Sequence, residues 1–317
     1  MKVLVVGGTG HIGSYLTPRL IRRGFEVLVT ARQAKPRHVL PELGWGKVQW
    51  VQCDKRQEEA SGAWAKRLAA LEVDAVVDLI TYTPAQNDQI VRAFKGRIRH
   101  FLNCGSIWAY GRSMRVPHRE HDPRDPASRY GKEKTAIEAD LMALHGREGF
   151  PATVIHPGHI CGRRWLPVDP SGGLDGTDIY RRLATGEPVV LPERGAYPLH
   201  HVHGDDVAQL FELCLLKPAE SIGQVFSAVA PYAMTMKGCC QAVAGLFGRQ
   251  ANLSYCSLDE LRGHPSYGII KSHIEESVVA TCEKAERLLG FRPRYTTEEI
   301  FAECIEYMIE SGQLKLP

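Results

Sequence analysis

The sequence predicts an α/β protein in which a doubly wound parallel sheet is followed by a smaller C-terminal α+β domain. The first observation is an unbroken apolar run, Val3–Val6, that passes directly into glycines. The second is the recurrence of such runs through the first half of the chain, separated by stretches with helical spacing; this alternation is typical of parallel sheets covered on both faces. The third is the length of 317 residues, which is enough for two domains or one large α/β unit.

A glycine-rich turn follows the first strand. Gly7, Gly10 and Gly13 lie three residues apart, and glycine lets a chain turn tightly and approach a pyrophosphate because it has no Cβ atom. A helix is expected from about Ile12, with its free N–H groups and its dipole facing the phosphates. An ordinary glycine-rich turn is the alternative, but the position at the first strand favours a Rossmann-type dinucleotide site. We expect its cofactor-binding residues to be Gly7, Gly10, His11, Ile12 and Gly13.

The end of the second strand bears on the choice of cofactor. Val27–Thr30 leads to Arg32, with no carboxylate where a NAD-specific site usually carries one for the ribose hydroxyls. An arginine suits a 2′-phosphate, and Lys35 and Arg37 add positive charge. We therefore expect NADP or NAD and favour NADP; a solvated surface arginine is the alternative for Arg32. Asp54, after the third strand, is placed to reach the adenine edge.

The other expected elements keep this alternation in the first half and change character in the second. Further strands are expected at Val48–Cys53, Ala75–Ile80, Ile98–Cys104 and Thr153–His156, and helices at Ala60–Leu71 and from Ser128 to about Gly146. Later elements are helices at Asp178–Gly186, Asp205–Leu216, Met236–Phe247, Lys284–Leu289 and Glu298–Ser311, and a short strand at Val189–Leu191. We expect an NAD(P)-binding domain over residues 1–163 and a substrate-binding domain over 164–317, with segments around 200–217 returning to the first.

A serine loop and a Tyr-x-x-x-Lys pattern follow the fifth strand. Tyr130 and Lys134 are four residues apart at the start of a helix and so share one face. Free tyrosine has a pKa near 10, and a nearby ammonium with an oxidised nicotinamide would lower it, which suits an acid and base. Ser106 can hydrogen-bond the same substrate oxygen. A second such pair, Tyr267 and Lys271, lies far downstream with no serine loop, so we assign the chemistry to the first.

Several motifs together resemble the extended short-chain dehydrogenases/reductases of the NAD-dependent epimerase/dehydratase family. They are Gly-Gly-Thr-Gly-His-Ile-Gly, Ser-Ile-Trp-Ala-Tyr-Gly, Tyr-Gly-Lys-Glu-Lys, His203–Ala208 and Lys284–Phe291, and they span nearly the whole chain. The resemblance implies hydride transfer to and from a carbon that bears oxygen. It also implies catalytic roles for Ser106, Tyr130 and Lys134, with Lys134 holding the nicotinamide ribose as well. Net oxidation or reduction and redox-neutral epimerisation use the same machinery, so both stay open.

Departures from the family pattern bear on the substrate. In sugar-nucleotide dehydratases of the family that this chain resembles, two carboxylic acids in the serine loop perform the elimination. This chain has Ile107 and Trp108 in those places, which disfavours elimination. His159 stands where many members carry a sugar-nucleotide-binding asparagine, which argues against a diphosphate-linked sugar unless Arg163 or Arg194 supplies the missing charge. We therefore expect a small, sugar-like secondary alcohol or ketone as substrate, contacted by Trp108, His159 and Arg163. A nucleotide-sugar epimerase is the alternative enzyme.

Charge, cysteines and histidines bear on partners and location. A net charge of +3 gives no reason to expect nucleic acid or membrane as a partner, and no apolar run approaches membrane-spanning length. Nine scattered cysteines without a Cys-x-x-Cys spacing, and no leader, indicate reduced thiols in the cytoplasm. His200, His201 and His203 suggest a metal, but hydride chemistry needs none and we expect no metal site. Arginines at 112, 115 and 119 are expected on a solvated loop, with an anion site as the alternative.

Two function classes remain after this reading. The first is an NAD(P)-dependent oxidoreductase or epimerase that acts as a homodimer, since the resemblance implies pairing through helices that flank the sheet. The second is a non-catalytic dinucleotide-binding regulator or nucleic-acid-associated protein on the same fold. The presence of Ser106, Tyr130 and Lys134 together favours the enzyme.

Overall fold

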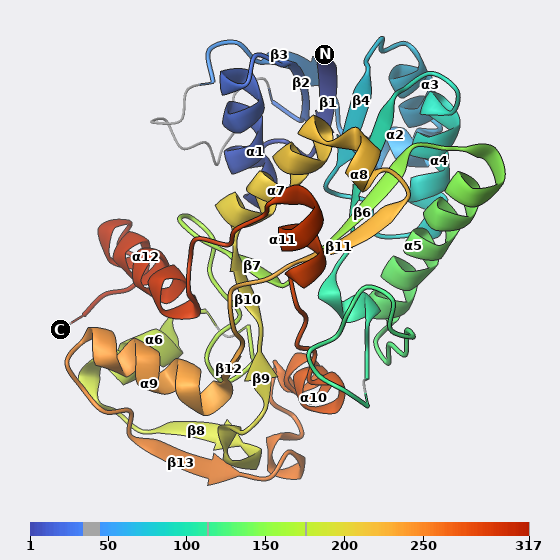
Figure 1. Ribbon diagram of the computed structural model, residues 1–317. Coiled ribbons are helices and arrows are strands. Elements are labelled where there is room, and N and C mark those ends of the chain that lie inside the picture. The colour runs from blue at the N-terminus through green and yellow to red at the C-terminus, as the bar shows by residue number, and fades with distance from the viewer. Residues whose placement is uncertain (34–44, 113, 175, 317) are drawn as a thin grey trace.

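The computed structural model describes residues 1–33, 45–112, 114–174 and 176–316. Its centre is a seven-stranded sheet with the order β11-β6-β5-β4-β1-β2-β3, in which every neighbouring pair is parallel (Figure 1). The strands are β1 Lys2–Val6, β2 Glu26–Ala31, β3 Gln49–Gln52, β4 Ala75–Asp78, β5 His100–Cys104, β6 Ala152–Pro157 and β11 Gln224–Ala228. The predicted fold class, a doubly wound parallel sheet with a further C-terminal unit, is confirmed.

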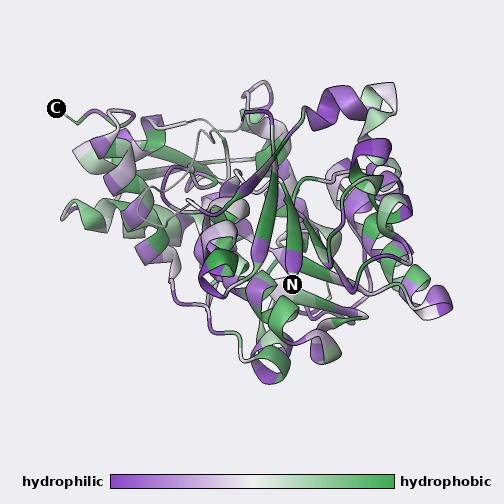
Figure 2. Cartoon of the chain, turned by 90° about the horizontal axis from the view of Figure 1, so that it is seen from above, coloured by the Kyte–Doolittle hydropathy of each residue, from purple (hydrophilic) through white to green (hydrophobic). Residues whose placement is uncertain are grey.

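Helices cover both faces of this sheet, because its strands are apolar on both sides (Figure 2). One core lies between the sheet and α1 His11–Arg22, α7 Gly204–Leu216 and α11 Glu283–Leu289. The other lies between the sheet and α3 Ala63–Ala69, α4 Pro84–Phe94 and α5 Arg129–Glu148. The carboxyl ends of β1, β4 and β5 meet at one edge of this sandwich, and the predicted site residues follow those ends.

The C-terminal unit has a core of its own. Its helices are α6 Asp178–Thr185, α9 Met236–Leu246 and α12 Thr297–Glu310, and they enclose a third apolar cluster. Short strand pairs complete it: β7 His159–Cys161 with β10 His201–His203, β8 Val189–Pro192 with β13 Leu253–Cys256, and β9 Pro198–Leu199 with β12 Met234–Thr235. Later segments of the chain also pack with the main sheet: β11 joins it beside β6, and α7 and α11 share its first core.

One local expectation was wrong. The single helix expected at Ala60–Leu71 is two helices, α2 Lys55–Ser61 and α3, because Gly62 between them adopts φ 71°, a left-handed conformation that ends a helix. Asp54 caps α2 by accepting from the N–H of Gln57 at 3.2 Å. The N-cap of α7 is His203, whose Nδ1 accepts from the N–H of Asp205 at 3.1 Å.

Within the described residues, no helix is both long and apolar enough to cross a membrane.

Candidate active site

The glycine turn after β1 brings the backbone close to the start of α1. Gly7 has φ 85°, and a Cβ atom there would lie 2.6 Å from Ile80 Cγ2. A Cβ atom at Gly13 would lie 2.4 Å from the Cα of Gly8, so helix and turn touch backbone to backbone. Gly10 is the N-cap of α1, which begins at His11, one residue before the predicted start. The turn therefore leaves the N-terminus of α1 open to a phosphate.

Two cavities meet at this turn and share Gly7, Gly10 and Ile80. One, of about 650 Å³, is lined by the ends of β2 and β3 and includes Arg32; we call it the arginine cavity. The other, of about 510 Å³, contains Ser106, Tyr130 and Lys134 and is called the tyrosine cavity. Together they form one groove that passes over the helix N-terminus, and this fits an extended dinucleotide with its pyrophosphate at the turn.

The arginine cavity is charged. Its lining includes Arg32, Asp54, Lys55 and Arg56, so the two residues predicted to contact the adenosine side both lie in it. Lys55 is engaged by Glu59 at 2.5 Å, and the Asp54 carboxylate caps α2. The predicted contributions of Lys35 and Arg37 lie outside the described residues.

In the tyrosine cavity, the serine loop and α5 bring Ser106 and Tyr130 together. Ser106 follows β5 and accepts from the N–H of Trp108 at 3.3 Å. Burial raises the pKa of Tyr130, and a hydrogen bond with the Ser106 side chain lowers it by less. The lowered tyrosine pKa expected from the sequence is therefore not produced by the polypeptide alone. Tyr130 still keeps 41% of its surface exposed, so it is accessible from the cavity.

Lys134 lies one turn along α5 and is almost fully buried at 2% exposure. Its ammonium donates to the carbonyl oxygens of Thr81 and Cys104, each at 2.7 Å, and so ties α5 to the ends of β4 and β5. Its Nζ lies 5.7 Å from the Tyr130 ring centroid and 5.1 Å from that of Tyr82. Burial lowers the pKa of Lys134.

A buried histidine behind the serine loop holds it in place. The N–H of Ser106 donates to His156 Nδ1 at 2.8 Å, and His156 Nε2 lies 2.7 Å from a carboxylate oxygen of Glu138. Because Nδ1 accepts, the imidazole carries its proton on Nε2 and donates it to Glu138. A Cβ atom at Gly105 would lie 2.2 Å from His156 Nδ1, so the loop fits against this ring only with glycine there.

Glu138 completes a repeat along α5. It follows Tyr130 and Lys134 at the same four-residue spacing, so the three side chains lie along one side of the helix. Arg124 donates to both Glu138 oxygens, at 2.7 and 3.2 Å. Burial alone would raise the pKa of Glu138, but His156 and Arg124 outweigh it and lower this pKa to about 2. The helix that carries Tyr130 therefore also positions Ser106, through Glu138 and His156.

Rings line the substrate side of the tyrosine cavity. The Trp108 ring lies 5.9 Å from that of His159 and 4.9 Å from that of His273, which comes from α10 Tyr267–Glu276. The two imidazoles meet Nε2 to Nε2 at 3.2 Å. On the opposite side Trp165 lies 4.0 Å from the His11 ring. Trp108 and His159 both line the cavity that contains Ser106.

Other candidates lie elsewhere. Arg163 directs its guanidinium to Glu310 at 2.5 Å and over the Tyr307 ring, and it is not among the described residues that line the tyrosine cavity. His200, His201 and His203 each contact a different partner, respectively the carbonyl oxygens of Ala230 and Val168 and the carboxylate of Glu303. In the described part of the chain, no group of three histidine, cysteine, aspartate or glutamate residues is arranged to hold a metal ion.

The expected loop arginines form surface ion pairs. Arg112, Arg115 and Arg119 lie within 3.9, 3.1 and 2.9 Å of Asp125, Asp122 and Glu283. The second Tyr-x-x-x-Lys pair lies on α10, where Lys271 pairs with Glu275 at 3.5 Å. Sequence reasoning missed three residues of the site: His156, Glu138 and His273. Glu138 had a signal, since it continues the four-residue spacing of Tyr130 and Lys134; His273 comes from a helix with no local signature.

Comparisons with known proteins identify the family. The NAD dependent epimerase/dehydratase family model matches residues 3–228. The chain is 29% identical over 214 residues to 2'-dehydrokanamycin reductase of Streptomyces kanamyceticus, covering 67% of this chain and 58% of that protein. It is 25% identical to UDP-glucose 4-epimerase of Mycolicibacterium smegmatis over 99% of this chain and 100% of that one. It is 24% identical to a chloroplast stem-loop binding protein of 41 kDa of Arabidopsis thaliana, over 94% and 76%.

Solved structures show the same fold. A UDP-glucose 4-epimerase of Thermotoga maritima with UDP-glucose has a TM-score of 0.75 at 21% identity, covering 98% of this chain and 99% of that one. A dTDP-glucose 4,6-dehydratase of Bacillus anthracis in complex with NAD has a TM-score of 0.76 at 16% identity, covering 99% of this chain and 98% of that one. The chain belongs to the NAD-dependent epimerase/dehydratase family and is an NAD-dependent enzyme of the short-chain dehydrogenase/reductase or epimerase kind.

Proposed function

We propose that this enzyme transfers hydride at a secondary alcohol or ketone carbon of a small substrate, with Tyr130 as the acid and base. The observation that carries the proposal is that Ser106, Tyr130 and Lys134 line one cavity, which also includes Gly7 and Gly10 of the glycine turn. The Ser106 and Tyr130 hydroxyls in this cavity can both contact one substrate oxygen. When bound in this groove, a nicotinamide cofactor would supply the hydride to a ketone or accept it from an alcohol.

Each residue has a distinct part in this reaction. Tyr130 donates its proton to the oxygen of a ketone, or takes the proton of an alcohol, while Ser106 orients that oxygen. Burial raises the tyrosine pKa, so the chain alone keeps the phenol protonated at neutral pH and ready to donate. Lys134 holds the carbonyls at the ends of β4 and β5 and presents its charge near the phenol and the nicotinamide ribose. Epimerisation needs the same groups. The ketone intermediate rotates in the site, so that the hydride returns to its opposite face.

The test compares two tyrosines in the same sequence pattern. Wild type, Tyr130→Phe and Tyr267→Phe are incubated with NAD or NADP and a panel of secondary alcohols and ketones, and nicotinamide absorbance and product epimers are followed. We expect Tyr130→Phe to lose about 10²–10⁴ in turnover while its affinity for NAD stays near that of wild type. Tyr267→Phe should behave as wild type. Full activity of Tyr130→Phe would refute the role of this phenol. A wild type that binds NAD but turns over no member of the panel would favour a non-catalytic dinucleotide-binding regulator.

Cofactor preference is proposed as NADP over NAD. The support is the position of Arg32 in the arginine cavity, where its guanidinium can pair with a 2′-phosphate. The family is described as NAD dependent, and a similar dehydratase structure is a complex with NAD, which supports NAD as the second cofactor.

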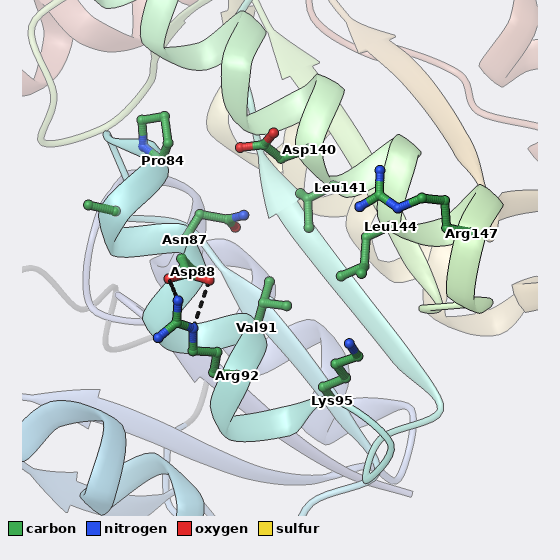
Figure 3. Close-up of a pocket in the computed structure, with 11 residues that line it drawn as sticks. Pro84, Asn87, Asp88, Val91, Arg92, Lys95, Asp140, Leu141, Leu144 and Arg147 are labelled. Atoms are coloured by element: carbon green, nitrogen blue, oxygen red, sulfur yellow. Dashed lines mark hydrogen bonds and ion pairs between the residues drawn. The ribbon is translucent and has the colours of Figure 1, made fainter.

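A homodimer is proposed through α4 and α5. A hollow between these helices has apolar and charged side chains of both signs around it (Figure 3). They include Val91, Leu141 and Leu144, with Asp88, Asp140, Arg92, Lys95 and Arg147. Two copies related by a two-fold axis could match these charges. Light scattering should give twice the chain mass for wild type and for the control Leu246→Glu, and a lower mass for Leu144→Glu; a monomeric wild type would contradict the dimer.

A cytoplasmic location is proposed from the thiols. All nine cysteines are free, and eight of them are buried. Proteins of oxidising compartments commonly form disulfides, so free thiols favour a reducing compartment such as the cytoplasm. A fluorescent fusion tests the location. The prediction that nucleic acid is not a partner stays a prediction, and a gel-shift assay with stem-loop RNA tests it in view of the similarity to a stem-loop binding protein.

A further inference from the structure

We infer that the tyrosine cavity takes an uncharged sugar ring without a phosphate group, in place of a sugar linked to a nucleoside diphosphate. The inference rests on the proposed function, because it names the substrate class of the same site. It is carried by three features of the described lining: its charge, its rings and the hydrogen-bonding state of its imidazoles.

Formal charge is scarce in this cavity. Among its described lining residues, Lys134 is the only lysine, arginine, aspartate or glutamate. That ammonium already donates to two carbonyl oxygens at 2.7 Å and lies on the side of α5, below Tyr130. A diphosphate placed on the substrate side would lose water without gaining a cation, and this is costly. The nearby Arg163 is directed to Glu310.

The walls on the substrate side are flat and apolar. Trp108 and Trp165 both line the cavity, and Leu166, Val168 and Leu174 complete that side. Indole faces of this kind stack on rings that present C–H groups and leave the ring hydroxyls free for polar contacts. A sugar ring in this place would lie between Trp108 and Trp165, with one hydroxyl or ketone oxygen reaching Ser106 and Tyr130.

Beside Trp108 the lining also presents the His159 imidazole, which contacts His273. His159 and His273 share a single Nε2 to Nε2 contact at 3.2 Å, so one ring donates and the other accepts. Burial and the neighbouring His273 and His201 hold the pKa of His159 well below its ordinary value, and burial lowers that of His273 to about 4. A neutral imidazole both donates and accepts, as a sugar hydroxyl does. His273 thereby acts as a positioning residue for His159, which faces the cavity.

The experiment uses ligands that share a ring and differ in charge. Full-length wild type saturated with NAD is titrated by calorimetry with methyl glycosides of glucose, galactose and mannose, and with their 1-phosphates and UDP-linked forms. We expect at least one methyl glycoside to bind about tenfold or more tightly than its phosphorylated and UDP-linked partners. Equal or tighter binding of a phosphorylated partner would overturn the inference, and so would the absence of binding by every methyl glycoside at about 10 mM.

A designed cation provides the second measurement. Leu166 lines the cavity and is 41% exposed, so Leu166→Lys adds a charge at its rim. The control Leu246→Lys adds the same charge at an exposed site on α9. We expect only Leu166→Lys to tighten binding of the 1-phosphates, by about tenfold; an unchanged preference would contradict a cavity limited by missing charge.

Failure of this inference can be separated from failure of the proposed function. The same titrations on Tyr130→Phe, in which the proposed turnover is blocked, measure binding alone and should give the same order of ligands. If turnover depends on Tyr130 but UDP-linked sugars bind best, the proposed chemistry stands and the substrate class is wrong. If the methyl glycosides bind best but Tyr130→Phe is fully active, the substrate class stands and the proposed chemistry is wrong.

Discussion

The two cavities that meet at the glycine turn differ most in charge. The arginine cavity carries Arg32, Asp54, Lys55 and Arg56, whereas the tyrosine cavity has Lys134 alone among its described lysine, arginine, aspartate and glutamate residues. Charge at one end suits the binding of a cofactor through its phosphates. A ring-lined, weakly charged end suits proton transfer, because hydrogen bonds and charges act more strongly where water is excluded. The same groove thus separates binding from chemistry.

Removing the one formal charge of the tyrosine cavity should have the largest effect. Lys134→Met leaves the carbonyls of Thr81 and Cys104 without their donor and takes the ammonium away from Tyr130. We expect turnover to fall about 10²–10⁴-fold and the melting temperature to drop, both measured beside Lys271→Met, which should match wild type. Retained turnover in a folded Lys134→Met would mean that this cavity needs no charge.

The next test concerns the support behind Ser106. His156→Leu removes the acceptor of the Ser106 N–H and the donor to Glu138. We expect turnover to fall about 10²-fold through misplacement of the serine, with NAD affinity kept because the arginine cavity is untouched. His156→Gln offers an acceptor and a donor and should recover part of the loss. Equal turnover in both variants would reduce His156 to a packing role.

A smaller effect is expected at the charged end. Arg32→Ala should weaken NADP binding about tenfold, since one charged contact to the 2′-phosphate is lost, and should leave NAD binding unchanged. Fluorescence titration of both cofactors measures this, with Arg262→Ala, an exposed arginine paired to Asp259, as the control. If both cofactors weaken equally, Arg32 contacts something other than the 2′-phosphate.

The smallest effect concerns Glu138, a charged residue behind the serine loop of the tyrosine cavity. The pKa of Glu138 is lowered from 4.5 to about 2. A lowered pKa means that the ionised carboxylate stabilises the folded state fully above pH 4.5, and that this contribution is lost as the pH falls toward 2. Glu138→Gln should therefore reduce the free energy of unfolding by about 1–3 kcal/mol at pH 7, with a difference that narrows below pH 4.5. Urea denaturation at several pH values measures it; a constant difference would contradict the assignment to charge.

The first half of the fold followed from its sequence because its signals are local. Val3–Val6 and the glycines after it are consecutive, and Tyr130 and Lys134 are one turn apart, so periodicity and motif were enough. Gly62 shows the limit: its left-handed conformation divides a stretch that otherwise has helical spacing. The sequence alone does not show whether a single glycine adopts a right-handed or a left-handed conformation.

The parts that could not be foreseen depend on contacts distant in sequence. β11 joins the sheet beside β6 some seventy residues later, and His273 reaches His159 across 114 residues. His156 is buried against Ser106 across 50 residues. Arg163 was predicted to contact the substrate because it lies just after β7, but its guanidinium pairs with Glu310 on the last helix. Tertiary pairing of this kind leaves no trace in local patterning.

A crystal structure with NAD bound tests the central claim most directly. The account predicts the pyrophosphate over Gly7–Gly13, the adenosine in the arginine cavity, and the nicotinamide in the tyrosine cavity, with the Ser106 and Tyr130 hydroxyls both in reach of one oxygen site above its reactive carbon. A nicotinamide lying outside the tyrosine cavity, or a Tyr130 hydroxyl turned away from Ser106 in that complex, would contradict it.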